Sequence, residues 1–348
     1  MKAVQFSEHG DRDVIEYGEF PDPTPDRDEV LVDIKAGALN HLDVWTRKGL
    51  PGLDLDMPHV PGSDGAGVVL EVGEDVTRFE AGDRVAVSAG VSCGKCEFCR
   101  HGEHSLCKGY HIIGEHVRGV HSEMAAVPEA NLVPVPEGVS WETAAAAPLV
   151  FQTAWRMLVV RADVQPGEKV LVLGASGGVG HAAVQIADYI GAEVYATGSS
   201  QEKLDHAKEM GAEYAINYAE EDFADKISEL TGKRGVDVVV DHIGKETYPD
   251  SLKSLAKGGR LVTCGATTGP NPGAGLNRIF WNQLSILGST MASHGEADDV
   301  LELVWKGEFE PAIREVLPMS EADRAHEMLE EREGFGKVVV VPDSEYDR

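Results

Sequence analysis

The sequence is poor in basic residues and lacks any long hydrophobic run. Lys and Arg together number 31 against 59 Asp and Glu in 348 residues, which gives a net charge of −28 at pH 7. No apolar run approaches the roughly 18–20 residues that a membrane span needs, and the N-terminal segment lacks the apolar core of a secretory signal. A surface this acidic repels nucleic acid and anionic membranes. We therefore expect a cytoplasmic protein that binds neither nucleic acid nor membrane.

The acidic residues are spread along the whole chain and do not form a tail. Solubility alone is one explanation. The explanation we favour is a halophilic protein in a salt-rich cytosol, where salt screens the self-repulsion and carboxylates keep the surface hydrated.

The length predicts two domains, because 348 residues exceed what one hydrophobic core usually serves. Residues 1–150 contain short β-like runs broken by Gly and Pro, as at 30–34, 67–72 and 83–87, which predicts an irregular β barrel. From residue 169 strands and helices alternate, with strands expected at 170–173, 193–197, 214–216, 236–240, 260–264 and 284–287. This alternation predicts an α/β domain with a parallel, doubly wound sheet. A final helix near 321–331 and a strand at 337–341 are expected to return to the first domain.

A glycine-rich segment joins the first of these strands to an amphipathic helix. Such a loop lets the backbone approach a pyrophosphate, which then faces the helix N-terminus. Gly177 serves the close approach and Gly180 the packing of the helix on the sheet, while Ala175 takes the place of the usual first glycine. The residues predicted to bind the dinucleotide here are Gly174, Ala175, Ser176, Gly177, Gly178, Val179 and Gly180.

The end of the second strand distinguishes between the two nicotinamide cofactors. NAD sites usually carry Asp or Glu there to hold the ribose 2′-hydroxyl. This chain has Ser199 and Ser200, followed by Lys203, and small hydroxyls with a cation suit a 2′-phosphate. We therefore predict NADPH, with NADH remaining possible. Ser199 with Glu202 also fits a capping box for the next helix.

Four of the five cysteines fall within 15 residues, at Cys93, Cys96, Cys99 and Cys107. Four thiolates at this spacing predict one closed, tetrahedral structural zinc site per chain. An iron–sulfur cluster is the competing metal centre, but the long final gap and the absence of proline after Cys107 count against it. Disulfides are not expected in a cytoplasm. Cys264 stands apart and is expected to be a buried apolar residue.

Together these features resemble the medium-chain dehydrogenase/reductase superfamily. The stretches that carry the resemblance are 39–45, 61–67 and 147–155, and within the superfamily the chain is similar to zinc-lobe members grouped between alcohol dehydrogenases and quinone oxidoreductases. The resemblance implies a GroES-like β-barrel catalytic domain of residues 1–151 and 289–348, with the zinc lobe at about 90–110. It implies a Rossmann cofactor domain at 152–288, an active site in the cleft between the domains, and a homodimer or homotetramer.

The chain departs from zinc alcohol dehydrogenases at the positions of the catalytic zinc ligands. The first Cys position is Asn40, the His and Glu positions are Ser63 and Asp64, and the second Cys position falls near Leu149. Zinc prefers Cys, His and carboxylate ligands, so we expect no catalytic zinc. The alternative is a relocated metal on local histidines, for which His41, His59, His111 and His116 are available.

Without a Lewis acid the resemblance favours NAD(P)H-dependent hydride transfer to a quinone, an enone or another activated carbonyl compound. One alternative is an alcohol dehydrogenase with unexpected metal ligands, and another is a non-enzymatic NADPH-binding protein. Asn40 is the candidate hydrogen-bond donor to the substrate oxygen, and His41, oriented by Asp43, is a candidate proton donor. The cofactor contacts that the resemblance implies are Thr153, His242, Ile243, Gly244 and, at the pyrophosphate, Lys337. Trp45 and Trp281 are candidates to line the substrate pocket.

Overall fold

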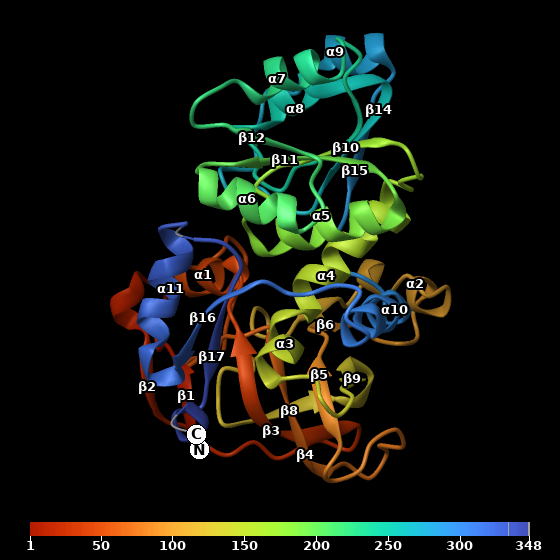
Figure 1. The fold of residues 1–348 in the computed structure, drawn as a ribbon. Helices are drawn as coiled ribbons and strands as arrows, with labels where there is room; N and C mark the ends of the chain where they lie inside the picture. Colours follow the sequence, from red (N-terminus) through yellow and green to blue (C-terminus); the bar gives the residue numbers. More distant parts are fainter. Residues whose placement is uncertain (333, 347–348) are drawn as a thin grey trace. The chain divides into compact units, whose positions relative to one another are not determined.

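The computed structural model describes residues 1–332 and 334–346, which fold into two compact units (Figure 1). One unit is Met1–Leu149 with Ala292–Arg348, and the other is Val150–Met291. No helix in the described ranges is long and apolar enough to cross a membrane.

The first unit is built on a sheet in the order β16-β17-β3-β4-β5-β9, with β8 also paired to β3. Its strands are β3 (Glu29–Ala38), β4 (Asp64–Val72), β5 (Arg84–Val87), β8 (Met124–Pro128), β9 (Leu132–Pro134), β16 (Ile313–Pro318) and β17 (Lys337–Val341). Two small antiparallel pairs accompany it: β1 (Lys2–Gln5) with β2 (Glu16–Glu19), and β6 (Gly90–Val91) with β7 (His111–Ile112). The tail strand β17 therefore returns to this unit, as predicted.

The pairing around β3 positions the residues of the candidate active site. Ala38, the last residue of β3, pairs with Asp64 on β4 and with Val339 on β17. The start of β4, the end of β3 and the start of β17 therefore meet at one end of these neighbouring strands, although they are far apart in the sequence. Three of the helices of this unit are α1 (His41–Lys48), α2 (Glu97–Arg100) and α3 (Trp141–Ala146). The others are α10 (His294–Trp305), α11 (Ala322–Glu330) and α12 (Asp343–Tyr346).

Small apolar side chains let α3 pack closely on the sheet of the first unit. The alanines at 144–146 on α3 are buried against Ala36 and Ala38 of β3 and Val339 of β17. Small residues on both surfaces allow the backbones to approach without voids. This packing fixes the position of the strand ends described above.

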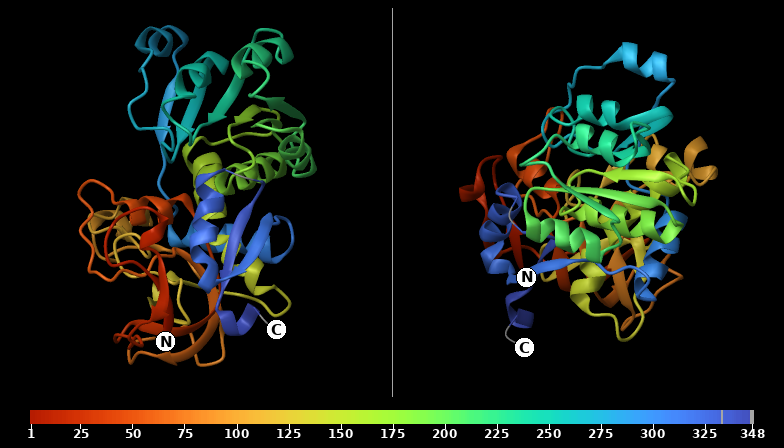
Figure 2. Two further views of the ribbon diagram at one scale, coloured as in Figure 1. Left: turned by 90° about the vertical axis from the view of Figure 1, so that its left-hand side faces the viewer. Right: turned by 45° about the horizontal axis from the view of Figure 1, so that its top comes forward.

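The second unit contains a sheet in the order β12-β11-β10-β13-β14-β15, in which every neighbouring pair is parallel. Its strands are β10 (Lys169–Val172), β11 (Glu193–Gly198), β12 (Tyr214–Asn217), β13 (Val236–Val240), β14 (Leu255–Thr263) and β15 (Ser285–Gly288). Its helices are α5 (Gly178–Ile190), α6 (Gln201–Glu209), α7 (Phe223–Leu230), α8 (Tyr248–Ser254) and α9 (Leu276–Asn282), and α4 (Pro148–Trp155) leads into it. Helices α5 and α6 cover one face of the sheet, and α7, α8 and α9 cover the other (Figures 1 and 2).

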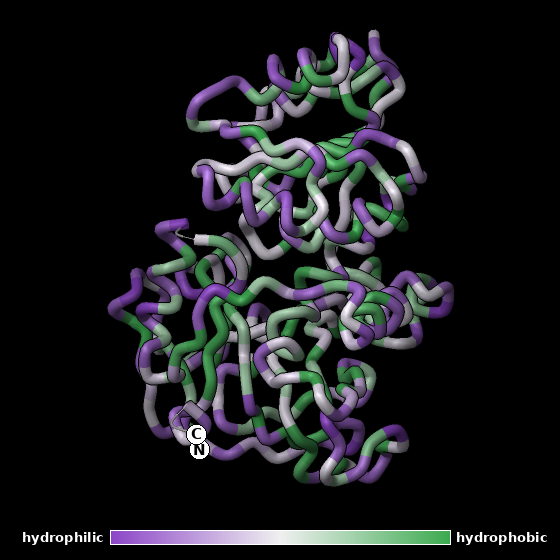
Figure 3. The backbone as a smooth tube through the Cα atoms, viewed as in Figure 1, coloured by the Kyte–Doolittle hydropathy of each residue, from purple (hydrophilic) through white to green (hydrophobic). Residues whose placement is uncertain are grey.

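Burial on both faces explains the continuous apolar runs of the central strands. Leu171, Val239 and Leu261 on β10, β13 and β14 belong to one buried cluster, and Figure 3 shows hydrophobic residues concentrated along these strands. The predicted fold class, a GroES-like barrel with a Rossmann-type doubly wound sheet, is confirmed. One local prediction is wrong: the cap of α6 is Ser200, whose side chain accepts from the backbone N–H of Lys203, and not Ser199.

Candidate functional site

The glycine loop between β10 and α5 has the backbone geometry that a dinucleotide needs. Gly174 has a φ of +59°, in the left-handed region that favours glycine. A Cβ on Gly180 would lie 2.1 Å from the carbonyl oxygen of Gly174, so only glycine lets α5 start this close to the strand. A Cβ on Gly177 would have only that same oxygen nearby, at 3.5 Å, so the space above Gly177 at the helix N-terminus is open. The loop fits a pyrophosphate group.

The end of β11 brings a hydroxyl and an ammonium group together beside this loop. Nζ of Lys203 lies 3.3 Å from Oγ of Ser199, while Ser200 is occupied as the cap of α6. At the same strand end, Thr197 accepts the N–H of Gly174 through its Oγ1 at 3.1 Å. Ser199 and Lys203 therefore lie together here, and their predicted contact with a phosphate on the ribose stays a prediction.

The turn after β13 lies against the glycine loop and is held by one carboxylate. Asp241 accepts hydrogen bonds from the N–H groups of Ile243 and Gly244, each at 3.0 Å, and from the hydroxyls of Thr247 and Ser251. The ring of His242 is close to the loop, because a Cβ on Gly174 would meet its Nε2 at 3.4 Å. Burial lowers the pKa of His242, so the imidazole is neutral near pH 7. The structure thus brings two predicted cofactor residues, His242 and Ile243, beside the predicted loop, and Gly244 follows them in the turn that Asp241 holds.

Thr153 lies elsewhere in the same unit. It is buried on α4, where its Oγ1 is 3.8 Å from Sδ of Met291. Its predicted contact with the cofactor stays a prediction.

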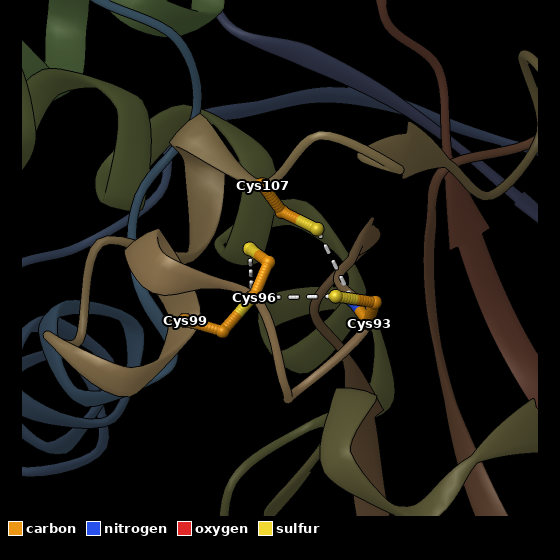
Figure 4. Close-up of side chains that lie close together, drawn as sticks. All are labelled: Cys93, Cys96, Cys99 and Cys107. Carbon is orange, nitrogen blue, oxygen red and sulfur yellow. Dashed lines mark hydrogen bonds between the residues drawn. The ribbon is translucent and has the colours of Figure 1, made fainter.

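The cysteine lobe forms a compact centre of four thiols (Figure 4). The four Sγ atoms of Cys93, Cys96, Cys99 and Cys107 all lie within 4.8 Å of one another, with 4.0 Å between Cys93 and Cys99 and 3.5 Å between Cys96 and Cys99. Zinc–sulfur bonds of about 2.3 Å in a tetrahedron place sulfurs about 3.8 Å apart, so the cluster fits a zinc ion. An iron–sulfur cluster has several irons between its ligands and needs a wider separation.

Backbone N–H groups support this centre. The N–H groups of Cys93 and Gly109 both point at Sγ of Cys107, at 3.3 Å each. Such donors stabilise a thiolate and orient it toward a metal. Four protein ligands leave no open position for a substrate, so this centre is structural.

Two of the positions that the resemblance aligns with catalytic zinc ligands, Asn40 and Asp64, form a hydrogen-bonded group with Lys337. Nζ of Lys337 lies 3.0 Å from Oδ2 of Asp64 and 2.5 Å from Oδ1 of Asn40. Nδ2 of Asn40 in turn donates to Oδ2 of Asp64 at 2.8 Å. The second oxygen of Asp64 accepts the backbone N–H of Leu149 at 2.9 Å. We call Asn40, Asp64 and Lys337 the buried triad, because their exposed fractions are only 7%, 0% and 3%.

The donor set of the buried triad does not fit a divalent cation. The hydroxyl of Ser63 donates to the carbonyl of Ile113 at 2.7 Å, and Asp64 is already neutralised by an ammonium group. A zinc ion at this place would have to displace Lys337, and the triad itself would offer it one carboxylate and one amide, a poor ligand set for zinc. In the described ranges, 1–332 and 334–346, the four cysteines are the only close group of metal-binding side chains.

The histidines proposed as alternative ligands are engaged elsewhere. A ring nitrogen of His59 is 3.1 Å from the carbonyl of Gly114, and one of His111 is 3.1 Å from that of Gly109. Nδ1 of His116 accepts the N–H of Ile112. His41 has its ring 6.0 Å from that of Trp45. A relocated metal site on these histidines therefore has no support among the described residues.

Asp43 lies at the start of α1, directly behind Asn40. Its carboxylate accepts the N–H groups of Asn40, at 2.7 Å, and of Gly62, at 3.1 Å. Burial raises the pKa of Asp43 to about 7, and the charge of Asp64 adds to this. In these contacts Asp43 fixes the turn that carries Asn40. Its predicted role in orienting His41 stays a prediction.

The pairing of Lys337 with Asp64 is the feature that sequence reasoning missed. Lys337 was expected at a pyrophosphate, and that contact stays a prediction. The signal that could have found the triad is the expected return of strand 337–341 to the barrel, which places its first residue near the end of β3 and the start of β4.

Comparison with known proteins agrees with this arrangement of barrel, zinc lobe and cofactor loop. A family model for the alcohol dehydrogenase GroES-like domain matches residues 26–137, and one for zinc-binding dehydrogenases matches residues 178–306. The acryloyl-coenzyme A reductase of Sulfurisphaera tokodaii is 34% identical over 349 residues, which cover 98% of this chain and 100% of that protein. The chain belongs to the medium-chain dehydrogenase/reductase superfamily.

Other members of the superfamily are also similar over nearly the full length. The quinone oxidoreductase of Pseudomonas aeruginosa is 33% identical over 353 residues, covering 98% of this chain and 99% of the relative. A crystal structure described as an NAD-dependent alcohol dehydrogenase superposes with a TM-score of 0.94 at 46% identity, covering 98% of this chain and 99% of that one. This medium-chain dehydrogenase/reductase is therefore an NAD(P)-dependent oxidoreductase, and the predicted family and enzyme class are confirmed.

Proposed function

We propose that this enzyme uses NADPH to reduce a carbonyl compound activated by conjugation, such as a quinone, an enone or a related α,β-unsaturated carbonyl compound. The observation that carries the proposal is the buried triad. Lys337 neutralises Asp64 at a position that the family resemblance aligns with a ligand of the catalytic zinc, so the buried triad offers a Lewis acid no suitable ligand set. Oxidation of a plain alcohol needs such an ion to lower the pKa of the hydroxyl, whereas a conjugated acceptor does not.

The names of the relatives support this class of substrate. One is an acryloyl-coenzyme A reductase and another a quinone oxidoreductase, and both names describe reduction of a conjugated carbonyl compound. The second candidate is an alcohol dehydrogenase, which the solved structure at 46% identity favours. That candidate requires a metal ion at the triad, which the donor set opposes.

The residues of this chain would divide the work as follows. The loop from Gly174 to Gly180 would hold the pyrophosphate, and Ser199 with Lys203 the 2′-phosphate. When bound, the nicotinamide supplies a hydride to the substrate. Negative charge then develops on the carbonyl oxygen, and a fixed hydrogen-bond donor lowers the barrier at that point. The anion so formed takes up a proton from water, which completes the reduction. The amide of Asn40 would be that donor.

Two measurements on freshly purified enzyme test the proposal. Metal analysis should give one zinc per chain, and a panel of quinones and enones should be reduced with NADPH, while primary and secondary alcohols are not oxidised. A chelator that leaves the structural zinc in place should not change the rate. Two zinc ions per chain with turnover of alcohols would refute the proposal in favour of the alcohol dehydrogenase.

A further inference from the structure

The amide of Asn40 is held in one orientation by two oppositely charged neighbours. An ammonium group can only donate and a carboxylate can only accept. Oδ1 of Asn40 therefore faces Nζ of Lys337, at 2.5 Å, and Nδ2 faces Oδ2 of Asp64, at 2.8 Å. The flipped amide would place an N–H group against the ammonium and an oxygen against the carboxylate. Both contacts would then be repulsive. The two charged neighbours therefore fix the positions of Oδ1 and Nδ2 of Asn40.

One of the two N–H bonds of Asn40 is left without a good acceptor. The first donates to Asp64. Among the residues that the structure describes, the acceptor given for the second is the carbonyl of Ala38, at 3.5 Å, beyond the usual range of about 2.7–3.2 Å for such bonds. Asn40 is 7% exposed, against 0% for Asp64 and 3% for Lys337, so it is the member of the triad with the most access to solvent.

Lys337 also changes the strength of that donor. A cation on the amide oxygen draws electron density away from the nitrogen, and hydrogen bonds in such a chain reinforce one another. Asp64 alone would oppose a developing negative charge nearby, since like charges a few ångströms apart repel strongly in a buried site. Lys337 cancels this charge.

We propose that Lys337 is a positioning residue that orients and polarises Asn40, so that one amide N–H donates to the substrate oxygen as that oxygen becomes negative. The inference rests on the proposed function and assigns to Lys337 an effect on the chemical step. Lys337 itself is not required to touch the substrate. In this enzyme an internal ammonium group acts through an amide, where a metal-dependent relative would use its zinc directly.

Steady-state kinetics with an enone and NADPH test the effect on the chemical step. Lys337→Met should lower kcat by about 10- to 100-fold, in the range for a weakened oxyanion donor, and leave KM for the enone little changed. Lys337→Arg should restore most of the loss, because a guanidinium still donates to Asn40. The primary isotope effect with 4-deuterated NADPH should rise in Lys337→Met, since hydride transfer becomes slower relative to the other steps.

A double variant and a substitution of another lysine serve as controls for misfolding. The double variant Asp64→Asn with Lys337→Met removes both charges. It leaves no unpaired carboxylate buried, but it still lacks the cation that polarises Asn40. Its kcat should therefore stay low. Lys35→Met, at a partly buried lysine paired with Asp33 and Glu345, should keep wild-type kcat. A wild-type kcat in the folded double variant overturns the inference.

An orientation measurement separates this inference from the proposed function. Neutron diffraction of deuterium-exchanged wild-type crystals should show two deuterons on the Asn40 atom beside Asp64 and none on the atom beside Lys337. The reverse assignment overturns the inference even if enones are good substrates. If the wild type reduces no conjugated carbonyl compound, the proposed function fails and the catalytic role of Lys337 fails with it, while the neutron result still decides its positioning role.

Discussion

Nζ of Lys337 and Oδ2 of Asp64 are 3.0 Å apart, with both side chains almost completely removed from solvent. Each charge loses its hydration on burial, which costs free energy. The cost is offset because the two charges pair with each other and both hydrogen-bond to the amide of Asn40. The relationship has a consequence for stability as well as for chemistry.

Lys337→Met should destabilise the protein strongly, because it leaves the carboxylate of Asp64 buried without a counter-ion. Removing one partner of a buried pair typically costs about 3–5 kcal/mol. The double variant Asp64→Asn with Lys337→Met should recover a large part of this loss. Urea unfolding measures both, and Lys35→Met, whose ion pairs are more exposed, should lose about 1 kcal/mol or less. Equal losses for the single and double variants would contradict the view that the unpaired charge is the cause.

Removal of the structural zinc should unfold the cysteine lobe. The thiols lie on short segments, α2 and the turns around it, and these have too little apolar surface to fold alone. Cys107→Ser should therefore reduce zinc content from one ion per chain toward zero and lower the midpoint of thermal unfolding. Cys264→Ser, at a cysteine outside the lobe, is the control and should retain its zinc. Normal stability of the Cys107 variant without metal would show that the centre is not structural.

How far the sequence predicts this molecule depends on the range of the interactions involved. The strands at 236–240 and 337–341 were located to the residue, because continuous apolar runs between turn residues are a local signal. The thiol cluster was also predictable, since its ligands lie within one short segment. The buried triad was not predictable from local patterns, because its members are separated by up to 297 residues. Only the pairing of β17 with β3 and of β3 with β4 brings them together. The cap of α6 was misplaced by one residue, since adjacent serines carry the same local signal.

Lys203→Glu should reduce the preference for NADPH over NADH. The ammonium group lies beside the hydroxyl of Ser199, and a charge-assisted bond to a phosphate is typically worth about 1.5–3 kcal/mol. We expect the ratio of kcat/KM for NADPH to that for NADH to fall by about tenfold or more. Lys208→Glu makes the same change of charge at an exposed position of the same helix and should leave the ratio near the wild-type value. An unchanged ratio in Lys203→Glu would exclude the assigned 2′-phosphate site.

Asp43 should make the protein less stable as the pH rises from about 4 to about 7. Its folded-state pKa is raised to about 7 by burial, above its ordinary value of 3.8. In this window the folded state therefore holds a proton that the unfolded state has lost. The contribution is fully present below the unfolded pKa and is lost as the pH rises through the folded one. Asp43→Asn should lower stability overall, because one backbone N–H loses its acceptor, and should flatten this part of the profile relative to the wild type. Parallel profiles from urea unfolding at pH 4 to 8 would rule out Asp43 as the titrating group.

The second unit offers a surface through which we propose that the enzyme forms a homodimer or homotetramer. Leu276, Phe280 and Trp281 on α9 are 68%, 65% and 76% exposed, which is unusual for side chains of this size. Strand β15 ends the order of the sheet beside them, and Ile286 on this strand is also exposed. A second copy of the chain would cover these side chains and the strand edge together. Phe280→Glu with Trp281→Glu should shift the mass measured by light scattering toward 37.4 kDa, the mass of one chain. Tyr218→Glu, at an exposed tyrosine after β12 on the opposite edge of the sheet, should not change the mass. A wild-type enzyme that is monomeric at micromolar concentration would exclude this interface.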